Sequence, residues 1–396
     1  MASEERTQVG IVGAGPAGLV LGRLLELAGI DTVILEARSR DYVEHRIRAG
    51  VLEHDTAELL AEAGVGERMR AEGLVHDGIE LRFGGAGHRI DFPKLTGGRH
   101  VVLYGQTELV KDLIAARLDT GAPLRFEATD VALHDIEGEP WIAYVHEGAE
   151  RILRCDAIAG CDGFHGVSRP AVPGLKVWER EYPFGWLGIL ADVPPSTDEL
   201  IYAHSERGFA LHSMRSLQLS RLYVQCDPTD DIANWSDARI WEELHQRLAL
   251  DGWSLQEGPI LDKGITPMRS FVAEPMRHGR LLLAGDAAHI VPPTGAKGLN
   301  LAVADVRLLA EALIARFTGG GEALLDAYSD SALQRVWRAE HFSWWMTSML
   351  HRFPERDAFG ERLQLSQLDY TCRSEAASTS LAENYVGLAT DWWSRA

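Results

Sequence analysis

Cysteine is scarce in this chain of 396 residues, with four in all, scattered along its length. Disulfide frameworks and thiolate metal sites need cysteines paired at short spacing, so we expect neither and predict a reduced, cytoplasmic protein. Positive charge is scarce too, because 39 Lys and Arg against 58 Asp and Glu give a formal net charge of −19. That sign argues against nucleic acid or an anionic membrane as the main partner.

Long hydrophobic runs are also missing. No stretch approaches the roughly 18 uninterrupted apolar residues of a membrane-spanning helix. Residues 1–7 are acidic and unlike a signal peptide, and we expect ordered structure to begin at Gln8. With 46% hydrophobic and 24% charged residues and no low-complexity linker, the chain suits two closely packed globular domains. No metal-binding pattern and no Ser-His-Asp signature stands out.

Hydrophobic periodicity divides the chain into elements typical of an α/β protein. The predicted strands cover 8–13, 32–36, 79–90, 123–154 and 281–284, and the predicted helices cover 16–28, 53–63, 106–118 and most of the chain after 298. Between about 185 and 270 the pattern changes to hairpins, among them 209–215 paired with 220–225. This pattern indicates a doubly wound nucleotide-binding unit that is interrupted by an antiparallel sheet.

The first strand and helix flank a G-x-G-x-x-G sequence, formed by Gly13, Gly15 and Gly18. These glycines permit a tight turn, close approach of backbone amides to a pyrophosphate, and close packing of helix on strand. Glu36 ends the following strand, where a carboxylate accepts hydrogen bonds from a ribose hydroxyl. Because strand, helix and acidic residue are in register, we predict dinucleotide binding over a purely structural turn.

A second polar site is expected where the late strand over 281–284 ends. The chain breaks at Gly285 and Asp286, passes through a proline-rich loop at 292–295, and opens a helix near Gly298. A carboxylate at this position can bind a ribityl hydroxyl, and the positive end of a helix favours negative charge beyond it. An Asx turn or helix cap at Asp286 is the structural alternative.

Together with Asp162-Gly163 in a second glycine-rich passage, these motifs resemble those of the class A, single-component flavoprotein aromatic hydroxylases. The resemblance spans nearly the whole chain in order. It is carried most specifically by the stretches 46–53, 182–188, 281–301, 342–347 and 382–387. The implied fold class is α/β, with a Rossmann-like FAD-binding domain, an inserted antiparallel β-sheet substrate domain and a helical C-terminal region.

The same resemblance implies an FAD-dependent monooxygenase. It would use NADPH or NADH and O2, through a flavin hydroperoxide, to hydroxylate 4-hydroxybenzoate to 3,4-dihydroxybenzoate. The implied assembly is a homodimer, in which the C-terminal helices with Trp344 and Trp345 form either core or interface. The implied domains are FAD-binding over 1–75, 100–180 and 270–350, substrate-binding over 76–99 and 181–269, and helical over 351–396. The implied FAD-binding residues are Gly13, Gly15, Gly18, Glu36, Arg48, Gln106, Asp286, Leu299 and Asn300.

A carboxylate clamp is predicted on the hairpin 209–225. Ser213 and Arg215 are two residues apart on one strand and so share a face of the sheet, as do Arg221 and Tyr223 on the partner strand. A guanidinium flanked by hydroxyl donors suits a carboxylate. The resemblance assigns the benzoate carboxylate to Ser213, Arg215 and Tyr223, and ordinary polar positions on an exposed hairpin are the structural alternative.

The resemblance also implies a proton relay from the substrate phenol through Tyr202 and Tyr385 to His76. A free phenol has a pKa of about 10, whereas attack on an electrophilic oxygen needs the phenolate. Pro293 would present its backbone carbonyl to the substrate hydroxyl or to the flavin edge. We take these four residues as catalytic, with Tyr202 and Pro293 also touching the substrate. Judged without the resemblance, His76 and the two tyrosines would be structural.

Four arginines lie between residues 38 and 48 of this acidic chain, where a solvated helix face is the simplest explanation. The resemblance instead implies a path for the nicotinamide cofactor along Arg38, Tyr42, Arg46, His165 and Arg269. Ala37 follows Glu36 where strict NADPH enzymes have a basic residue, so the preference between NADPH and NADH stays open. The alternatives in function are a hydroxylase of a related phenolic acid, a flavin oxidase or reductase without oxygen insertion, and a flavin-binding redox sensor.

Overall fold

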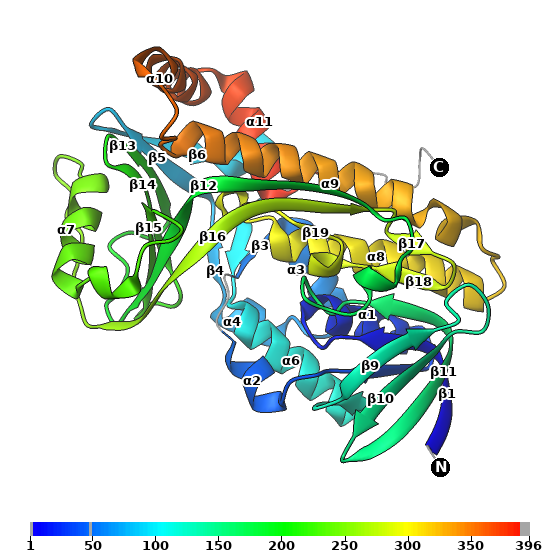
Figure 1. Cartoon of the computed structure of the whole chain (residues 1–396). Helices are drawn as coiled ribbons and strands as arrows, with labels where there is room; N and C mark the ends of the chain where they lie inside the picture. Colours follow the sequence, from blue (N-terminus) through cyan, green and yellow to red (C-terminus); the bar gives the residue numbers. More distant parts are fainter. Residues whose placement is uncertain (1–2, 47–49, 389–396) are drawn as a thin grey trace.

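The structure, a computed structural model, describes residues 3–46 and 50–388 (Figure 1). Its first sheet has the strand order β17–β18–β11–β1–β2–β8, with β10 and β9 continuing from β11. These strands are β1 (Ser3–Val12), β2 (Thr32–Leu35), β8 (Leu124–Arg125), β9 (Thr129–His134), β10 (Trp141–His146), β11 (Ala149–Gly160), β17 (Arg277–His278) and β18 (Leu281–Leu283). Strand β11 pairs in parallel with both β1 and β18. The prediction that the strand at 281–284 completes this sheet is therefore confirmed.

Strand β1 begins earlier than predicted. It starts at Ser3, whereas the sequence suggested that order begins at Gln8. The extra residues pair with the long strand β11, beginning with Ser3 beside Arg151. An ion pair between Glu4 and Arg154 lies across the same two strands. These partners come from about 150 residues away, so the local pattern of residues 1–7 could not reveal them.

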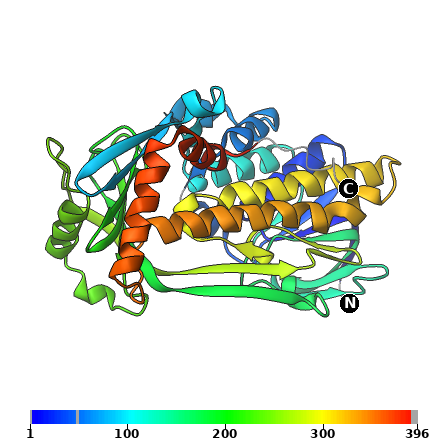
Figure 2. The ribbon, with the colours of Figure 1, turned by 90° about the horizontal axis from the view of Figure 1, so that it is seen from above.

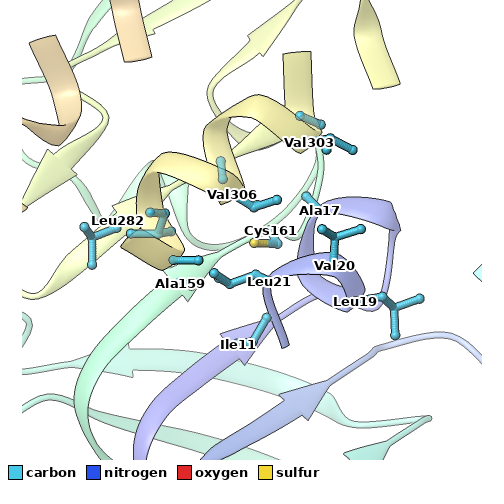
Figure 3. Packing of buried hydrophobic residues seen from close by; sticks show 14 of the residues in the cluster. Ile11, Ala17, Leu19, Val20, Leu21, Ala159, Cys161, Leu282, Val303 and Val306 are labelled. Atoms are coloured by element: carbon cyan, nitrogen blue, oxygen red, sulfur yellow. The ribbon is translucent and has the colours of Figure 1, made fainter. Parts of the chain in front are cut away.

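Helices α1 (Pro16–Leu27) and α8 (Gly298–Phe317) pack on this sheet as predicted (Figure 3). Ile11 of β1, Leu21 of α1 and Val306 of α8 are fully buried there, and burial of such side chains stabilises each by about 1.5–3 kcal/mol. The helix α1 lies so close to the preceding turn that a Cβ atom added at Gly18 would stand 2.0 Å from the carbonyl oxygen of Gly13. The sequence therefore needs glycine at this position.

A second sheet is antiparallel except where β13 pairs with β5, and its order is β19–β16–β12–β15–β14–β13–β5–β6. Its strands are β5 (Gly78–Phe83), β6 (Ala86–Asp91), β12 (Lys176–Ala191), β13 (Leu200–Ser205), β14 (Gly208–Met214), β15 (Ser220–Cys226), β16 (Ile260–Glu274) and β19 (His289–Ile290). The long strands β12 and β16 pair along their length and run from one sheet to the other (Figure 1). The predicted inserted antiparallel sheet, including its 209–225 hairpin, is confirmed.

Helices cover both faces of the second sheet. One face packs on α7 (Asp237–Arg247), whereas the other contributes to a core shared with α9 (Ala323–Leu350) and α11 (Glu375–Val386). Helices α8 and α9 lie side by side, and α10 (Ala358–Arg373) crosses the end of α9 (Figure 2). The remaining elements are α2 (Arg40–His45), α3 (His54–Glu62), α4 (Glu67–Glu72), α5 (Phe92–Thr96), α6 (Gln106–Asp119) and a small sheet of β3 (Val51–Leu52), β7 (Val101–Leu103) and β4 (Leu74–His76). Within residues 3–46 and 50–388, no helix has the length and apolar character needed to cross a membrane.

The contact at Gly18 gives a stability test. We expect Gly18→Ala to destabilise the ligand-free protein by about 1–3 kcal/mol, because backbone atoms must shift to admit the methyl group. Gly15→Ala is the matched control, since a Cβ there meets no heavy atom within 4 Å and Gly15 has φ −75°. Thermal unfolding followed by circular dichroism measures both variants. Equal melting temperatures for the two would contradict this account of the turn.

Candidate active site

The turn between β1 and α1 leaves room for a ligand at the start of the helix. Gly13 has φ 104°, and a Cβ atom there would stand 2.3 Å from the carbonyl oxygen of Cys161. Gly15 caps α1 without any side-chain hydrogen bond and borders open space. Glu36, at the end of β2, accepts a hydrogen bond from the backbone N–H of Ala14 at 2.8 Å. Backbone donors, open space and a carboxylate in this arrangement suit the pyrophosphate and ribose of a dinucleotide.

The second glycine-rich passage folds back on itself around Asp162. The Asp162 carboxylate accepts a hydrogen bond from the backbone N–H of Ser168 at 2.9 Å, and burial raises the pKa of this carboxyl group. Arg169 then donates to the carbonyl oxygens of Phe164 at 2.6 Å and Ala287 at 3.3 Å. The arginine thereby joins this passage to the third motif, at 285–287.

The three motifs meet in space. Gly13 lies against the backbone of Cys161, which joins the first motif to the second. Gly285, in turn, lies against Ala17 of α1 and Ala302 of α8, since a Cβ added at Gly285 would come within 3.3 Å of both side chains. Asp286 is exposed beside this contact. The chain thus brings three turns and the starts of α1 and α8 to one region, as FAD binding requires.

Helix α8 also begins without a side-chain cap, and Leu299 and Asn300 lie in its first turn. The Asn300 side chain is already used by the protein. Its oxygen accepts from the backbone N–H of Glu53 at 2.8 Å, and its amide donates to Val51 and Ala296 at 2.9 Å each. Both amide hydrogens of Asn300 are therefore used, and its backbone and the second lone pair of its side-chain oxygen are left for the predicted contact with the cofactor.

Two further residues predicted to bind FAD belong to other segments. Gln106 begins α6, whose N-cap residue, Gly105, offers no side-chain hydrogen bond to the helix. Arg48 lies outside the described residues. The positions that the structure does describe fit FAD, because two uncapped helix starts offer positive ends to phosphate and flavin while Glu36 and Asp286 offer acceptors to the ribose and ribityl hydroxyls.

Four neighbouring strands of the second sheet place polar and aromatic residues in one row. Tyr202 on β13 pairs with Leu211 on β14, which pairs with Tyr223 on β15, which pairs with Gly188 on β12. Directly paired residues point to the same face of a sheet. Ser213, two residues from Leu211, lies on this face as well. Two of the predicted clamp residues, Ser213 and Tyr223, and the predicted relay residue Tyr202 therefore share one face.

Arg215 follows the end of β14 and is half-buried against the start of α6. It donates a hydrogen bond to the hydroxyl of Thr107 at 2.9 Å. Its guanidinium lies so close to Gly105 that a Cβ atom added there would stand 2.5 Å from the guanidinium carbon. Burial lowers the pKa of this guanidinium. A cation removed from water in this way gains strongly from a carboxylate partner.

Arg221 supplies a second guanidinium on this face of the sheet, and it was not among the predicted site residues. It pairs across the hairpin with Ser213 and donates to the hydroxyl of Tyr223 at 3.3 Å. One of its terminal nitrogens is buried and has no hydrogen-bond partner among the described residues. The two-residue spacing to Tyr223 was the signal that could have identified it.

The two relay tyrosines, which lie 183 residues apart, form a hydrogen bond between their hydroxyl groups at 2.7 Å. Both are fully buried, and burial raises both pKa values above 10. Tyr385, on α11, also stacks on Phe92 with ring centres 5.0 Å apart. Both tyrosines are therefore neutral at physiological pH, and each can accept one proton and release another without a lasting change of charge.

His76 is buried at the end of β4, but it makes no hydrogen bond to either tyrosine within the described part of the chain. Burial lowers the pKa of its imidazole to about 4, although Glu199, Asp198 and Asp77 oppose the shift. The ring is therefore neutral at pH 7 and keeps a nitrogen that can accept a proton. Its predicted place at the end of the relay stays a prediction.

A buried ion cluster holds Tyr385, the second residue of this relay. Lys297, just before α8, donates to Glu53 at 2.7 Å and to the carbonyl oxygen of Tyr385 at 2.9 Å, and Arg335 donates to the other oxygen of Glu53 at 3.0 Å. Burial alone would raise the pKa of Glu53, but the two cations outweigh it and lower the pKa. Lys297 and Glu53 were not predicted as site residues, although both belong to stretches that carried the family resemblance.

Pro293 begins a short 3-10 turn, Pro293–Gly295, that precedes Lys297. Its carbonyl oxygen accepts a hydrogen bond from the backbone N–H of Ala296 at 2.9 Å. A carbonyl oxygen has two lone pairs, so it can still accept a second hydrogen bond from a substrate hydroxyl. Ala296 itself adopts φ 53°, a left-handed conformation that is strained for a residue with a Cβ atom.

The residues predicted to bind the nicotinamide cofactor form two groups near the surface. In one, the guanidinium of Arg38 lies 5.4 Å from the ring centre of Tyr42, and Arg46 ends the same helix, α2. In the other, the Phe164 ring contacts both His165 and Arg269, at 5.0 Å each. Both groups combine a cation with an aromatic ring, which suits a nucleotide, but the preference between NADPH and NADH stays open.

Comparison with known proteins agrees with this geometry. A curated p-hydroxybenzoate hydroxylase from Acinetobacter baylyi is 53% identical over 97% of this chain and 96% of its own length. A probable NADH-specific resorcinol 4-hydroxylase from Rhodococcus jostii is 25% identical over 83% of this chain and 62% of its own length. The solved structure of p-nitrophenol 4-monooxygenase from Pseudomonas putida shares the fold, with a TM-score of 0.83, 22% identity, and coverage of 98% of this chain and 100% of that one.

The sequence model of the FAD binding domain family matches residues 6–343, which include all three glycine-rich motifs and the inserted sheet. This match and the close Acinetobacter relative confirm the resemblance to flavoprotein hydroxylases. The chain therefore belongs to the FAD binding domain family.

Proposed function

We propose that this protein is an FAD-dependent monooxygenase that hydroxylates 4-hydroxybenzoate to 3,4-dihydroxybenzoate, using NADPH or NADH and O2. One observation supports the substrate most directly. The buried pair of Tyr202 and Tyr385 and the cationic group of Arg215 and Arg221 border the same face of one sheet. A para-hydroxylated benzoate has a phenol at one end and a carboxylate at the other, so it matches both.

The spacing of the strands agrees with this substrate. Tyr202 and Tyr223 are two strands apart in one row, which separates their backbones by roughly 10 Å. A single benzene ring with its two substituents fits between side chains that reach inward from such positions. In this arrangement Ser213, Arg215 and Tyr223 bind the carboxylate, and Tyr202 receives a hydrogen bond from the phenol.

Each group of the site then has a chemical task. FAD, when bound, supplies the redox chemistry, because it can take a hydride from the nicotinamide cofactor and activate O2. Tyr202 accepts the phenol proton while its own proton moves to Tyr385, and Tyr385 releases its proton toward His76, which leaves the electron-rich phenolate of the substrate. The Pro293 carbonyl accepts a hydrogen bond from the substrate hydroxyl and so fixes the orientation of that end of the substrate ring. The shared aromatic core excludes water and so strengthens these interactions.

The positive charges around the proposed site of the substrate ring also favour ionisation of the substrate phenol. Arg215 and Arg221 lie at the carboxylate end, and the Lys297 ammonium lies 5.8 Å from the centre of the Tyr385 ring. Cations around a buried site stabilise a dianion that carries both carboxylate and phenolate. The site thus supports proton removal without placing a strong base next to the ring.

The presence of two sheets supports a division of the chain into two domains and a helical region. We propose an FAD-binding domain over 1–75, 100–180 and 270–350, a substrate-binding domain over 76–99 and 181–269, and a helical region over 351–396. Because its cysteines are few and scattered, we also propose that the protein acts in the cytoplasm.

We further propose that the protein is a homodimer that pairs through α10. Phe359, Leu363 and Tyr370 are 71%, 57% and 62% exposed and lie on one side of this helix at spacings of four and seven residues. Beside them, a groove of about 360 Å³ runs between α9, α10 and α11. In a two-fold dimer the same apolar row would be covered on both subunits.

Product analysis tests the function. Purified, FAD-loaded protein is mixed with NADPH or NADH in air, with and without 4-hydroxybenzoate. We expect the substrate to accelerate nicotinamide oxidation and 3,4-dihydroxybenzoate to form in equal amount. Oxidation that ignores the substrate, or that yields only hydrogen peroxide, would contradict the proposal.

The clamp predicts a selective loss of substrate affinity. We expect Arg215→Ala to raise the KM for 4-hydroxybenzoate about tenfold to a hundredfold, since a hydrogen bond to a charged group contributes about 1.5–3 kcal/mol. FAD should stay bound. Arg89→Ala, which changes an exposed arginine on the same sheet, is the control and should keep the wild-type KM. If Arg215→Ala loses FAD and keeps its KM, the clamp is misassigned.

The relay predicts a pH-dependent defect. We expect Tyr385→Phe to slow hydroxylation more than it weakens substrate binding, because the proton of Tyr202 loses its acceptor. Since a free phenol ionises near pH 10, the rate should recover partly between about pH 7 and 9. Tyr144→Phe, in the first sheet, removes another buried hydroxyl and controls for general damage. A constant ratio of Tyr385→Phe to wild-type rates across this range would argue against the relay.

The dimer prediction concerns mass in solution. We expect the wild-type protein to have the mass of two chains by light scattering, and the double variant Phe359→Glu with Leu363→Glu to have the mass of one. The pair of substitutions places like charges on both sides of the two-fold contact. A dimer that survives the double variant would mean that another surface forms the interface.

A further inference from the structure

Helix α9 packs directly against the turn that carries Pro293. Gly295 lies so close to this helix that an added Cβ atom would stand 2.8 Å from the Ser343 hydroxyl and 3.1 Å from the Phe342 ring. Its φ is not positive, so the need for glycine comes from this contact alone. Both α9 residues belong to the stretch 342–347, which the FAD and substrate sites do not otherwise use.

A chain of hydrogen bonds reinforces the contact. The hydroxyl oxygens of Thr294 and Thr347 are 2.8 Å apart, and the Thr347 hydroxyl donates to the carbonyl oxygen of Ser343 at 2.7 Å. A threonine hydroxyl has a single proton. Because Thr347 gives its proton to its own helix, Thr294 must be the donor in the bond between the two side chains. All three residues are completely buried.

The turn needs such a restraint. Ala296, which donates its N–H to the Pro293 carbonyl, has the strained φ of 53°. A strained backbone persists only where the surroundings hold it. Asn300 holds the turn from the side of α8 through the Ala296 carbonyl. The hydrogen bond from Thr294 to Thr347 is the polar contact that holds it from the side of α9.

We propose that Thr347 is a positioning residue for the hydroxylation step, acting through Thr294 on the backbone carbonyl of Pro293. This inference rests on the proposed role of Pro293 at the substrate hydroxyl. Thr347 touches neither the reacting atoms nor the cofactor. Its hydroxyl fixes the turn, and the turn fixes the angle at which the substrate ring meets the activated oxygen. Loss of this bond should misdirect the oxygen, so that peroxide forms in place of product.

Two substitutions separate the hydroxyl from the shape of the side chain. Thr347→Val keeps the branched shape and removes the acceptor for Thr294, whereas Thr347→Ser keeps the hydroxyl and removes a methyl group. Ser343→Ala is the matched control, because its hydroxyl faces the same turn but has no hydrogen-bond partner among the described residues. All three proteins are compared with wild type for FAD content and melting temperature.

The first measurement is the amount of 3,4-dihydroxybenzoate formed per NAD(P)H consumed. For Thr347→Val we expect this ratio to fall about threefold to tenfold, the change that corresponds to one lost hydrogen bond, with the KM within about twofold of wild type. Thr347→Ser and Ser343→Ala should keep the wild-type ratio. A wild-type ratio for Thr347→Val, or an equal loss for Thr347→Ser, would overturn the proposal.

The second measurement needs no turnover. Hydrogen exchange of the peptide that spans residues 291–300 reports how firmly the turn is held. We expect faster exchange there in Thr347→Val than in Thr347→Ser, with no difference in the first sheet. If wild type makes no product but this exchange pattern appears, the proposed substrate is wrong while the restraint on the turn stands. If exchange is unchanged in both threonine variants, the restraint itself is refuted.

Discussion

The structure around the site depends on burying an ionised carboxylate. Glu53 is only 3% exposed, so its charge must be stabilised by cations and donors from distant parts of the chain. Lys297 comes from the start of α8, Arg335 comes from α9, and Asn300 binds the backbone of Glu53 itself. Removing Glu53 would leave the buried ammonium of Lys297 without its countercharge. This requirement fixes α8, α9 and the segment before α3 relative to one another.

The same cluster links the two halves of the chemistry. Lys297 follows directly on the Pro293 turn, and its ammonium also holds the carbonyl of Tyr385. The segment that carries Pro293, which we propose to contact the substrate, and Tyr385, the second tyrosine of the proposed relay, are thus tied to one buried cation. The cofactor side and the relay side of the site cannot shift independently without disturbing this pairing.

Local sequence patterns predicted the parts of the site that depend on short spacing. The glycines from Gly13 to Gly18 identified the nucleotide turn, and the two-residue spacing of Ser213 and Arg215 placed both on one hairpin. The hydrogen bonds of Asn300, the pairing of Ser3 with Arg151 and the contact between Thr294 and Thr347 were not predictable in this way. Apart from the bond of Asn300 to Ala296, they join residues between 53 and 249 positions apart, and no periodicity records which distant polar groups meet once the core has formed.

The insertion of the antiparallel sheet between β11 and β18 has a consequence for synthesis of the chain. The parallel sheet around the nucleotide site is incomplete until β18 at 281–283 pairs with β11, and α8 follows only at 298–317. A ribosome therefore exposes about three quarters of this chain before FAD has a finished site. All strands of the inserted sheet except β19 emerge earlier, and its hairpins β5–β6, β13–β14 and β14–β15 pair with near neighbours, so these hairpins can form before the cofactor site is complete.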